Sequence, residues 1–319
     1  MYRWLAIGVF VACKSSSTPL TGSGSASGAP PKSIDAPVVA VDAAVATKPP
    51  PSPTLRPGGP GDCKPDYAPK PDRDPNPMCK VAGGAFEMGD HRKVELSPFV
   101  LDEFEVTNAQ IQFFLETTHA DESCKDCFIF DANPPAPVRK ADGAYTLDPA
   151  LAKQPYTWAR REGAVAYCTW AGKQLPTEAQ FEFVARFDPT SKRARAFPWG
   201  DAMDPKRARC DCGGPAKGLV DVGSFDGANG AGDGRSPWGP HDLAGNAREW
   251  IADCNLVTPR CDGTCKDPVD RGDGTKCRRA YKGGASDDPD LDMTRVQDGL
   301  DHAGIRCAIG GAFPPDLHK

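Results

Sequence analysis

The stretch Asp242-Leu243-Ala244-Gly245-Asn246-Ala247-Arg248-Glu249-Trp250 carries the strongest local pattern in this chain of 319 residues. Its glycine frees the backbone to turn sharply, and the asparagine that follows tolerates a left-handed conformation. Carboxylates stand near both ends of the turn, at Asp242 and Glu249. Taken alone, these residues fit a turn in the core, in which the asparagine hydrogen-bonds the backbone and Trp250 packs inside.

The chain around this stretch is organised as one domain-sized block. Aromatic residues and apolar periodicity begin near Met78 and continue to about Phe313, without an internal repeat. We predict one domain over residues 80–313, a cysteine-bearing lead-in at 63–79 and a short tail at 314–319. Gly and Pro number 33 each, so long irregular loops and short strands are expected around a few helices.

Three segments of the block carry helix signals. Thr107 is followed three residues later by a glutamine, the spacing of a capping box, in which side chain and backbone at a helix start hydrogen-bond each other. Thr177 repeats this pattern. Apolar residues follow each start at helical spacing, so one face of each helix should be buried. A further helix is expected over residues 162–170, ended by Gly172.

The first thirteen residues have the shape of a secretory signal. A cation at Arg3 precedes an apolar run that is too short to span a membrane. The run ends in Phe10-Val11-Ala12-Cys13, which resembles a bacterial lipobox, whose cysteine thiol receives a diacylglycerol and becomes the mature N-terminus. An ordinary signal peptide cut elsewhere is the alternative.

Residues 14–62 contain no aromatic side chain and are rich in Pro, Gly and Ser. Such a segment buries too little apolar area to offset its chain entropy, so we predict a disordered tether between anchor and domain. With Cys13 lipidated, 12 of the 13 cysteines remain, an even number that suits an exported protein with disulfides. The expected location is the bacterial cell envelope, on its periplasmic face or at the cell surface.

Composition also narrows the partners. The formal net charge is -5, whereas sequence-independent nucleic-acid binding needs clustered cations, so no nucleic-acid partner is expected. No apolar run reaches the roughly 18–20 residues of a membrane span. Membrane contact is therefore predicted through the lipid anchor only.

In chain order, the block carries a series of short signatures at residues 83–89, 104–108, 166–173, 175–182, 197–200, 239–250, 282–286 and 304–307. Together they resemble the formylglycine-generating enzyme family, also called sulfatase-modifying factors, over nearly all of residues 80–312. The resemblance implies a formylglycine-generating-enzyme-type variant of the C-type lectin fold. Such a domain is mixed α+β and low in regular secondary structure, and in this chain it would be rich in disulfides.

Family members with oxidase activity convert a cysteine of a sulfatase into formylglycine, using two cysteines that hold copper in a groove. The resemblance places those cysteines between the Gly283-Gly284 pair and Arg295, where residues 285–294 contain none. Cu(I) needs soft thiolate ligands, for which carboxylates are poor substitutes. We therefore predict neither a copper site nor formylglycine generation.

Other relatives are mononuclear iron oxidases that rely on a histidine cluster in an added helical domain. The histidines of this chain are scattered without a ligand spacing; they are His91, His119, His241, His302 and His318. An iron site is not predicted either.

The resemblance assigns a calcium ion to residues 242–250. Ca²⁺ is a hard cation that binds oxygen ligands. Asp242 and Glu249 would give carboxylates, and Gly245 and Ala247 would give backbone carbonyls. The site would be structural, because its positions are filled by the chain.

The resemblance also pairs Cys168 with Cys307 in a disulfide. Among the other cysteines, Cys124-Lys-Asp-Cys127 is open to interpretation as a redox dithiol or half a zinc site, and the four from Cys254 to Cys277 as zinc ligands. Disulfides are favoured because thiols oxidise outside the cell. Their connectivity does not follow from the sequence.

The loop that replaces the catalytic interval is acidic. Its candidate ligand-binding residues are Ser286, Asp288, Asp290, Asp292 and Arg295. If the loop lines the groove, its charges favour cationic peptides or calcium-bridged sugars; a solvated acidic loop is the alternative. By the resemblance, the first of two family arginines, Arg295, lies near the groove, and the second, Arg306, is a buried structural partner.

Two classes of function remain. The first is a non-catalytic binding or structural module, carried by an envelope-anchored lipoprotein, with a peptide, protein or glycan as its partner. The second is an oxidoreductase of the same family, a metal-dependent oxidase that uses a non-standard site. The interval without cysteines favours the first class, so no catalytic residue is assigned.

Overall fold

The computed structural model describes residues 61–131, 135–212, 218–228, 230–254, 261, 263–270, 280–289, 291–294, 299 and 301–311. The chain divides into two compact units, Met1–Asp35 and Ala36–Lys319, and every described residue belongs to the second. The predicted signal peptide with Cys13, nearly all of the tether, and the tail at 314–319 lie outside the described residues. None of the described helices combines the length and apolar character that crossing a membrane requires.

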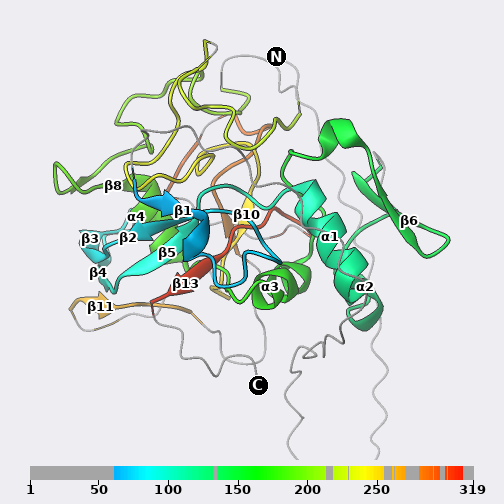
Figure 1. Cartoon of the computed structure of the whole chain (residues 1–319). Coiled ribbons are helices and arrows are strands. Elements are labelled where there is room, and N and C mark those ends of the chain that lie inside the picture. Colours follow the sequence, from blue (N-terminus) through cyan, green and yellow to red (C-terminus); the bar gives the residue numbers. More distant parts are fainter. Residues whose placement is uncertain are drawn as a thin grey trace, which may run out of the picture. The chain divides into compact units, whose positions relative to one another are not determined.

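The central sheet contains four antiparallel strands in the order β1 (Cys63–Lys64), β2 (Met78–Val81), β5 (Phe99–Asp102) and β13 (Ala308–Gly310). Figure 1 shows that the first and last parts of the described chain meet in this sheet, blue strands lying near the red β13. The residues of the predicted lead-in, 63–79, supply β1 and half of β2. They are therefore part of the domain's own sheet.

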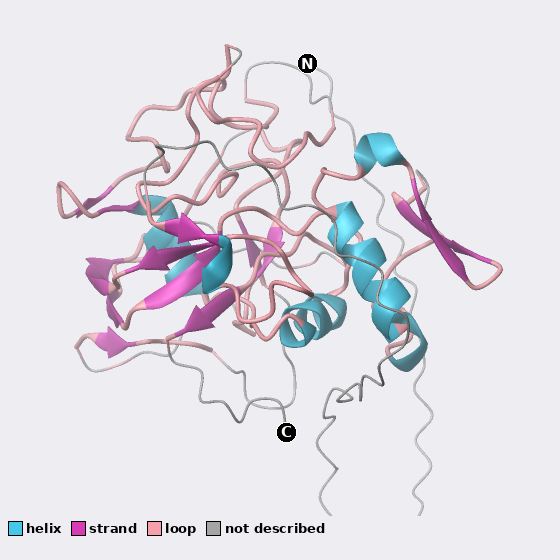
Figure 2. Ribbon diagram, viewed as in Figure 1, coloured by secondary structure: helices cyan, strands magenta, loops and turns pink. Residues whose placement is uncertain are grey.

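The remaining strands are short. A second sheet orders β11 (Cys265–Lys266), β4 (Lys93–Leu96) and β3 (Gly84–Glu87), with β11 parallel to β4. Three pairs complete the set: β10 (Glu249–Trp250) with β12 (Tyr281–Lys282), β6 (Val138–Ala141) with β7 (Ala144–Leu147), and β8 (Phe187–Asp188) with β9 (Arg193–Ala194). Loops make up most of the described backbone (Figure 2), as the sequence predicted.

The three predicted helices are confirmed. α1 (Asn108–Thr118) and α4 (Glu178–Arg186) each begin with a complete capping box, made by Thr107 with Gln110 and by Thr177 with Gln180. α3 (Arg161–Trp170) ends shortly before Gly172, whose φ is +74°. The short α2 (Ala120–Ser123) and the 3-10 turns η1 (Pro65–Tyr67) and η2 (Pro149–Leu151) were not anticipated.

Two apolar clusters form the core. One gathers the inner faces of α1 and α3, where the rings of Phe114 and Tyr167 meet edge to face with centroids 5.5 Å apart. The other joins α4 to β3 and β4 and includes the edge-to-face pair Phe86 and Phe183 at 5.1 Å. In the structure, Cys168 and Cys307 form a disulfide that ties α3 to the residue before β13 across 139 positions of sequence. In the loop-entropy model, a cross-link of this span stabilises the fold by roughly 4–5 kcal/mol.

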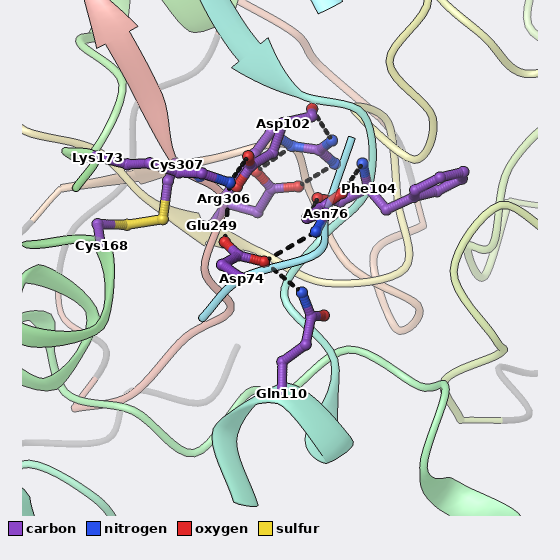
Figure 3. Close-up of a disulfide and its surroundings, with 10 residues drawn as sticks. All are labelled: Asp74, Asn76, Asp102, Phe104, Gln110, Cys168, Lys173, Glu249, Arg306 and Cys307. Carbon is purple, nitrogen blue, oxygen red and sulfur yellow. Dashed lines mark hydrogen bonds and ion pairs between the residues drawn. A yellow bond between two sulfur atoms is a disulfide. The ribbon is translucent and has the colours of Figure 1, made fainter. Parts of the chain in front are cut away.

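A buried ion cluster fastens the lead-in to this core (Figure 3). Nζ of Lys173 donates to Oδ2 of Asp74 at 2.8 Å and to Oδ1 of Asp102 at 2.6 Å, and all three side chains are fully buried. Gln110 on α1 donates to the other oxygen of Asp74 at 2.8 Å. Burial raises the pKa of Asp102 to about 7, against the opposing charge of Lys173. One ammonium therefore compensates two buried carboxylates.

Replacing the ammonium of Lys173 tests how much the cluster contributes to the free energy of unfolding. Lys173→Met leaves both carboxylates buried without a cation, so we expect a loss of about 3–5 kcal/mol in the free energy of unfolding at pH 7. Losing the cation raises the pKa of Asp102 in the folded state further, because the charge of Lys173 opposes the effect of burial. Stability that depends on its protonation falls as pH rises, so the loss should shrink near pH 5. Denaturant unfolding with intact disulfides measures it. The exposed Lys153→Met is the control, and an equally small effect of Lys173→Met would contradict the assignment.

Candidate functional site

The segment 242–250 is wound tightly against the chain around Arg209. Asp242, Gly245 and Asn246 have φ values of +55°, +85° and +59°. A Cβ on Gly245 would lie 2.3 Å from the carbonyl oxygen of Arg209, so only glycine fits this close approach. The backbone N–H of Asn246 donates to the same carbonyl at 2.8 Å.

Glu105, in the loop between β5 and α1, accepts hydrogen bonds from the segment 242–250. Its Oε2 accepts a hydrogen bond from Nδ2 of Asn246 at 2.7 Å, and its Oε1 accepts one from the backbone N–H of Ala247 at 2.9 Å. Oδ1 of Asn246 accepts from the N–H of Val220 at 3.1 Å. Trp250 is fully buried and donates to the carbonyl of Ala159 at 2.9 Å. The contacts expected of a core turn are therefore present.

Arg306 is the cation at the centre of this region. Its Nε and Nη2 donate to the two oxygens of Glu249 at 2.9 and 2.8 Å. Nη1 donates to the carbonyls of Asp102 and Glu103, each at 3.0 Å, and Nη2 also donates to the carbonyl of His241 at 2.8 Å. The predicted role of Arg306 as a buried structural partner is confirmed, because its side chain is completely buried.

Carboxyl groups outnumber cations here. Glu105, Asp242 and Glu249 are all buried, and Arg306 is the guanidinium among them. Burial raises the pKa of Glu105 well above its usual value, and the charges of Asp242 and Glu249 raise it further. Burial also raises the pKa of Asp242 to about 6, although the N–H of Gly223 donates to its Oδ2 at 2.6 Å.

The residues that the family resemblance assigns to calcium offer oxygen donors. The four predicted ligands are all buried; Asp242, Gly245 and Ala247 lie in the turn, and Glu249 begins β10. Arg306 donates to Glu249 and Gly223 donates to Asp242. Each carboxylate oxygen has two lone pairs, so these hydrogen bonds leave lone pairs that a cation can bind. A hard divalent cation would balance the carboxyl groups that the single guanidinium does not.

The acidic loop is bound to the chain's own groups. Oδ1 of Asp288 accepts from Nη2 of Arg248, and its Oδ2 accepts from the N–H of Ala285 at 2.8 Å. Oδ1 of Asp287 lies 3.1 Å from Nη1 of the same arginine. The N–H of Ser286 donates to the carbonyl of Asn246 at 3.1 Å, which ties the loop to the segment 242–250.

Among the other candidate ligand-binding residues, Asp292 accepts hydrogen bonds from the backbone and hydroxyl of Thr294 at 2.9 and 2.6 Å. Asp290 and Arg295 lie outside the described residues. The described acidic side chains of the loop therefore contact Arg248 or the loop's own backbone, and two of them, Asp287 (67% exposed) and Asp292, are exposed.

A disulfide that the sequence did not assign lies beside this loop. Cys210 and Cys212 are bonded to each other. The N–H of Asp211 donates to the carbonyl of Asp288 at 2.9 Å, and Sγ of Cys212 lies 3.8 Å from that carbonyl. The Cys-Asp-Cys spacing was the available signal. Its contact with a loop 76 positions later along the chain was not readable from the sequence.

The other described sulfur pairs are also disulfides. They are Cys63–Cys79, Cys124–Cys127 and Cys261–Cys265. In this state, Cys124 and Cys127 provide no thiolate for a zinc site.

The family model described as "Sulfatase-modifying factor enzyme 1-like domain" matches residues 64–310. The chain belongs to this sulfatase-modifying factor family. The match runs from Lys64 in β1 to Gly310 at the end of β13.

Named relatives are of two kinds. The formylglycine-generating enzyme of Thermomonospora curvata is 31% identical over 253 residues, covering 65% of this chain and 82% of that protein. The protein named inactive C-alpha-formylglycine-generating enzyme 2 of Bos taurus is 26% identical over 279 residues, covering 75% of this chain and 89% of that one. Both an enzyme and a protein named inactive therefore share this sulfatase-modifying factor domain.

Similarity to solved structures shows the fold. The structure of PvdO from Pseudomonas aeruginosa superposes with a TM-score of 0.53 at 19% identity, covering 79% of this chain and 98% of that one. The expected formylglycine-generating-enzyme-like fold, mixed and poor in helices, is thus confirmed.

The hydrogen bonds of the Arg306 guanidinium lead to a specific prediction. Arg306→Lys keeps the charge but offers one ammonium where a planar guanidinium serves five acceptors, so buried carbonyls lose their donors. We expect the free energy of unfolding to fall by about 2 kcal/mol or more, measured by denaturant unfolding. Arg193→Lys, at an arginine whose side chain is 56% exposed, is the matched control. Equal stability of the two variants would show that the guanidinium hydrogen bonds of Arg306 do not stabilise the fold.

Proposed function

We propose that this chain is an envelope-anchored lipoprotein whose sulfatase-modifying factor domain is a non-catalytic binding or structural module. One observation carries the proposal. The interval 285–294 has no cysteine, and its Asp288 is held by Arg248 and by the backbone of Ala285. Hard oxygen groups bound to internal partners replace soft sulfur ligands in this interval, and they do not suit Cu(I).

The preserved scaffold supports the proposal. Three buried side chains hold the segment 242–250 in place: Arg306 donates to Glu249, and Glu105 accepts from the N–H of Ala247. This supporting structure is intact although the interval 285–294 contains no cysteine. A relative of similar extent carries the name inactive, which is a property of that protein and makes a non-catalytic use of this domain plausible by analogy.

The loop geometry narrows the partner chemistry. Asp287 is exposed, whereas the side chain of Asp288 is 13% exposed and lies against Arg248. Two carboxylates against one guanidinium leave net negative charge at the surface of the loop. A peptide, protein or glycan partner with a cationic group, or one bridged by calcium, suits this charge.

A second candidate function is a metal-dependent oxidase that works from a non-standard site. The observation in its favour is the Cys210–Cys212 disulfide, which packs against Asp288 in the replaced interval. Reduction of this pair would present two soft thiolates beside that loop.

One experiment separates these two functions. The full-length protein, with and without mild reduction and added Cu(I), is given a cysteine-containing sulfatase-motif peptide, and oxygen consumption is recorded. We expect no turnover, together with binding on a peptide and glycan array that weakens several-fold in Asp287→Asn but not in the exposed control Asp66→Asn. Metal-dependent turnover that disappears in Cys210→Ser/Cys212→Ser would overturn the non-catalytic proposal in favour of the oxidase.

We also propose a structural calcium ion at residues 242–250. Calcium that binds the folded state raises the free energy of unfolding by mass action, by about 2.7 kcal/mol at a concentration 100 times the dissociation constant. The melting temperature should therefore rise on adding calcium to chelated protein, and Asp242→Asn should reduce the rise more than the exposed Asp201→Asn. An unchanged melting temperature after exhaustive chelation and calcium addition would count against this site.

A further inference from the structure

A second group of reactive side chains lies where the central sheet begins. Cys63 on β1 and Cys79 on β2 are directly paired across the strands and joined by a disulfide. One carboxylate oxygen of Glu103, just beyond β5, and both sulfurs lie within 4.8 Å of one another. Among the residues that the structure describes, no other three His, Cys, Asp or Glu side chains gather so closely.

Glu103 lacks a hydrogen-bond donor for one of its oxygens. Its side chain is 7% exposed, and Oε2 has no partner in the described structure. Oε1 lies 3.9 Å from Nε2 of His241, whose own Nδ1 is also unpartnered within the described residues. A buried carboxylate without a donor costs free energy, and such a group is expected to have a compensating role.

Glu103 has a raised pKa. Burial raises the pKa of Glu103 to about 7, and the guanidinium groups of Arg235 and Arg306 oppose the rise. His241 is a further titratable group that faces Glu103. The two sulfurs also lie beside this carboxyl group; they donate no hydrogen bond as a disulfide but gain S–H donors as thiols.

The two sulfurs differ in access. Cys63 is partly exposed, whereas Cys79 is completely buried. An external thiolate therefore reaches Cys63 first, and the leaving sulfur is the inner one beside Glu103. Cys168–Cys307 offers no such entry, because both of its cysteines are completely buried.

We propose that Cys63–Cys79 is a redox-active disulfide that oxidises a dithiol partner, with Glu103 as the proton donor to Cys79. A partner thiolate attacks Sγ of Cys63, the Cys63–Cys79 bond breaks, and its electron pair leaves on Sγ of Cys79. That sulfur takes the carboxyl proton of Glu103. The second partner thiolate then attacks the mixed disulfide and releases Cys63 as a thiolate. The partner loses two electrons and becomes a disulfide, the pair gains two electrons, and solvent returns a proton to Glu103.

The test uses the full-length oxidised protein with dithiothreitol as the dithiol. Samples are quenched with iodoacetamide at intervals, and mass spectrometry measures the reduction of each disulfide. The ratio of the Cys63–Cys79 rate in the native protein to that in Glu103→Gln cancels the ionisation of dithiothreitol. We expect this ratio to be about 10 or more at pH near 6, where Glu103 holds its proton, and to approach 1 above pH of about 8.5.

The Cys168–Cys307 disulfide, measured in the same samples, is the internal control. Cys168–Cys307 should stay oxidised while Cys63–Cys79 reacts; if Glu103→Gln loosens the fold, Cys168–Cys307 will react faster too. In that case Glu103→Asp, which keeps a carboxyl group, decides: the proposal requires it to retain the faster low-pH reaction. A ratio of 1 at every pH, or reduction of Cys63–Cys79 no faster than that of Cys168–Cys307, would overturn the proposal.

Discussion

The fold depends on one guanidinium. Arg306 joins both oxygens of Glu249 to the carbonyls that end β5 and to the carbonyl of His241, so it connects three segments that are far apart in sequence. A domain with few helices and short strands has few regular backbone ladders to hold its loops. A fully buried cation with five fixed donors supplies that order instead, because buried loop carbonyls need hydrogen-bond donors.

The same logic extends to the rest of the interior. Lys173 holds Asp74 and Asp102, and Glu105 holds the amides of Asn246 and Ala247. Buried polar networks of this kind specify a conformation closely, because losing one partner leaves the others unsatisfied. Apolar packing lies on either side, against α1 and α3 in one cluster and against α4 in the other.

This arrangement separates the loop at 285–289 from the supporting frame. The loop at 285–289 rests on Asn246 through Ser286 and on Arg248 through Asp288, and the buried network below does not involve its side chains. Substitutions in the loop therefore alter its chemistry with little effect on the supporting structure. Two disulfides lie near acidic residues: Cys210–Cys212 beside the carbonyl of Asp288, and Cys63–Cys79 beside the carboxyl group of Glu103. Cys63, Cys210 and Cys212 are partly exposed.

The sequence by itself determined the family, the mixed fold with few helices, and the helix starts at Thr107 and Thr177. Those features are local: a capping box needs residues three positions apart, and each family signature is a short run. The tertiary structure alone decided which distant groups meet. Glu105 with Asn246, Lys173 with Asp74, and Cys212 with the carbonyl of Asp288 are pairs 141, 99 and 76 positions apart. Their contact depends on how the loops pack, because a single residue in a loop carries no periodic signal of its partner.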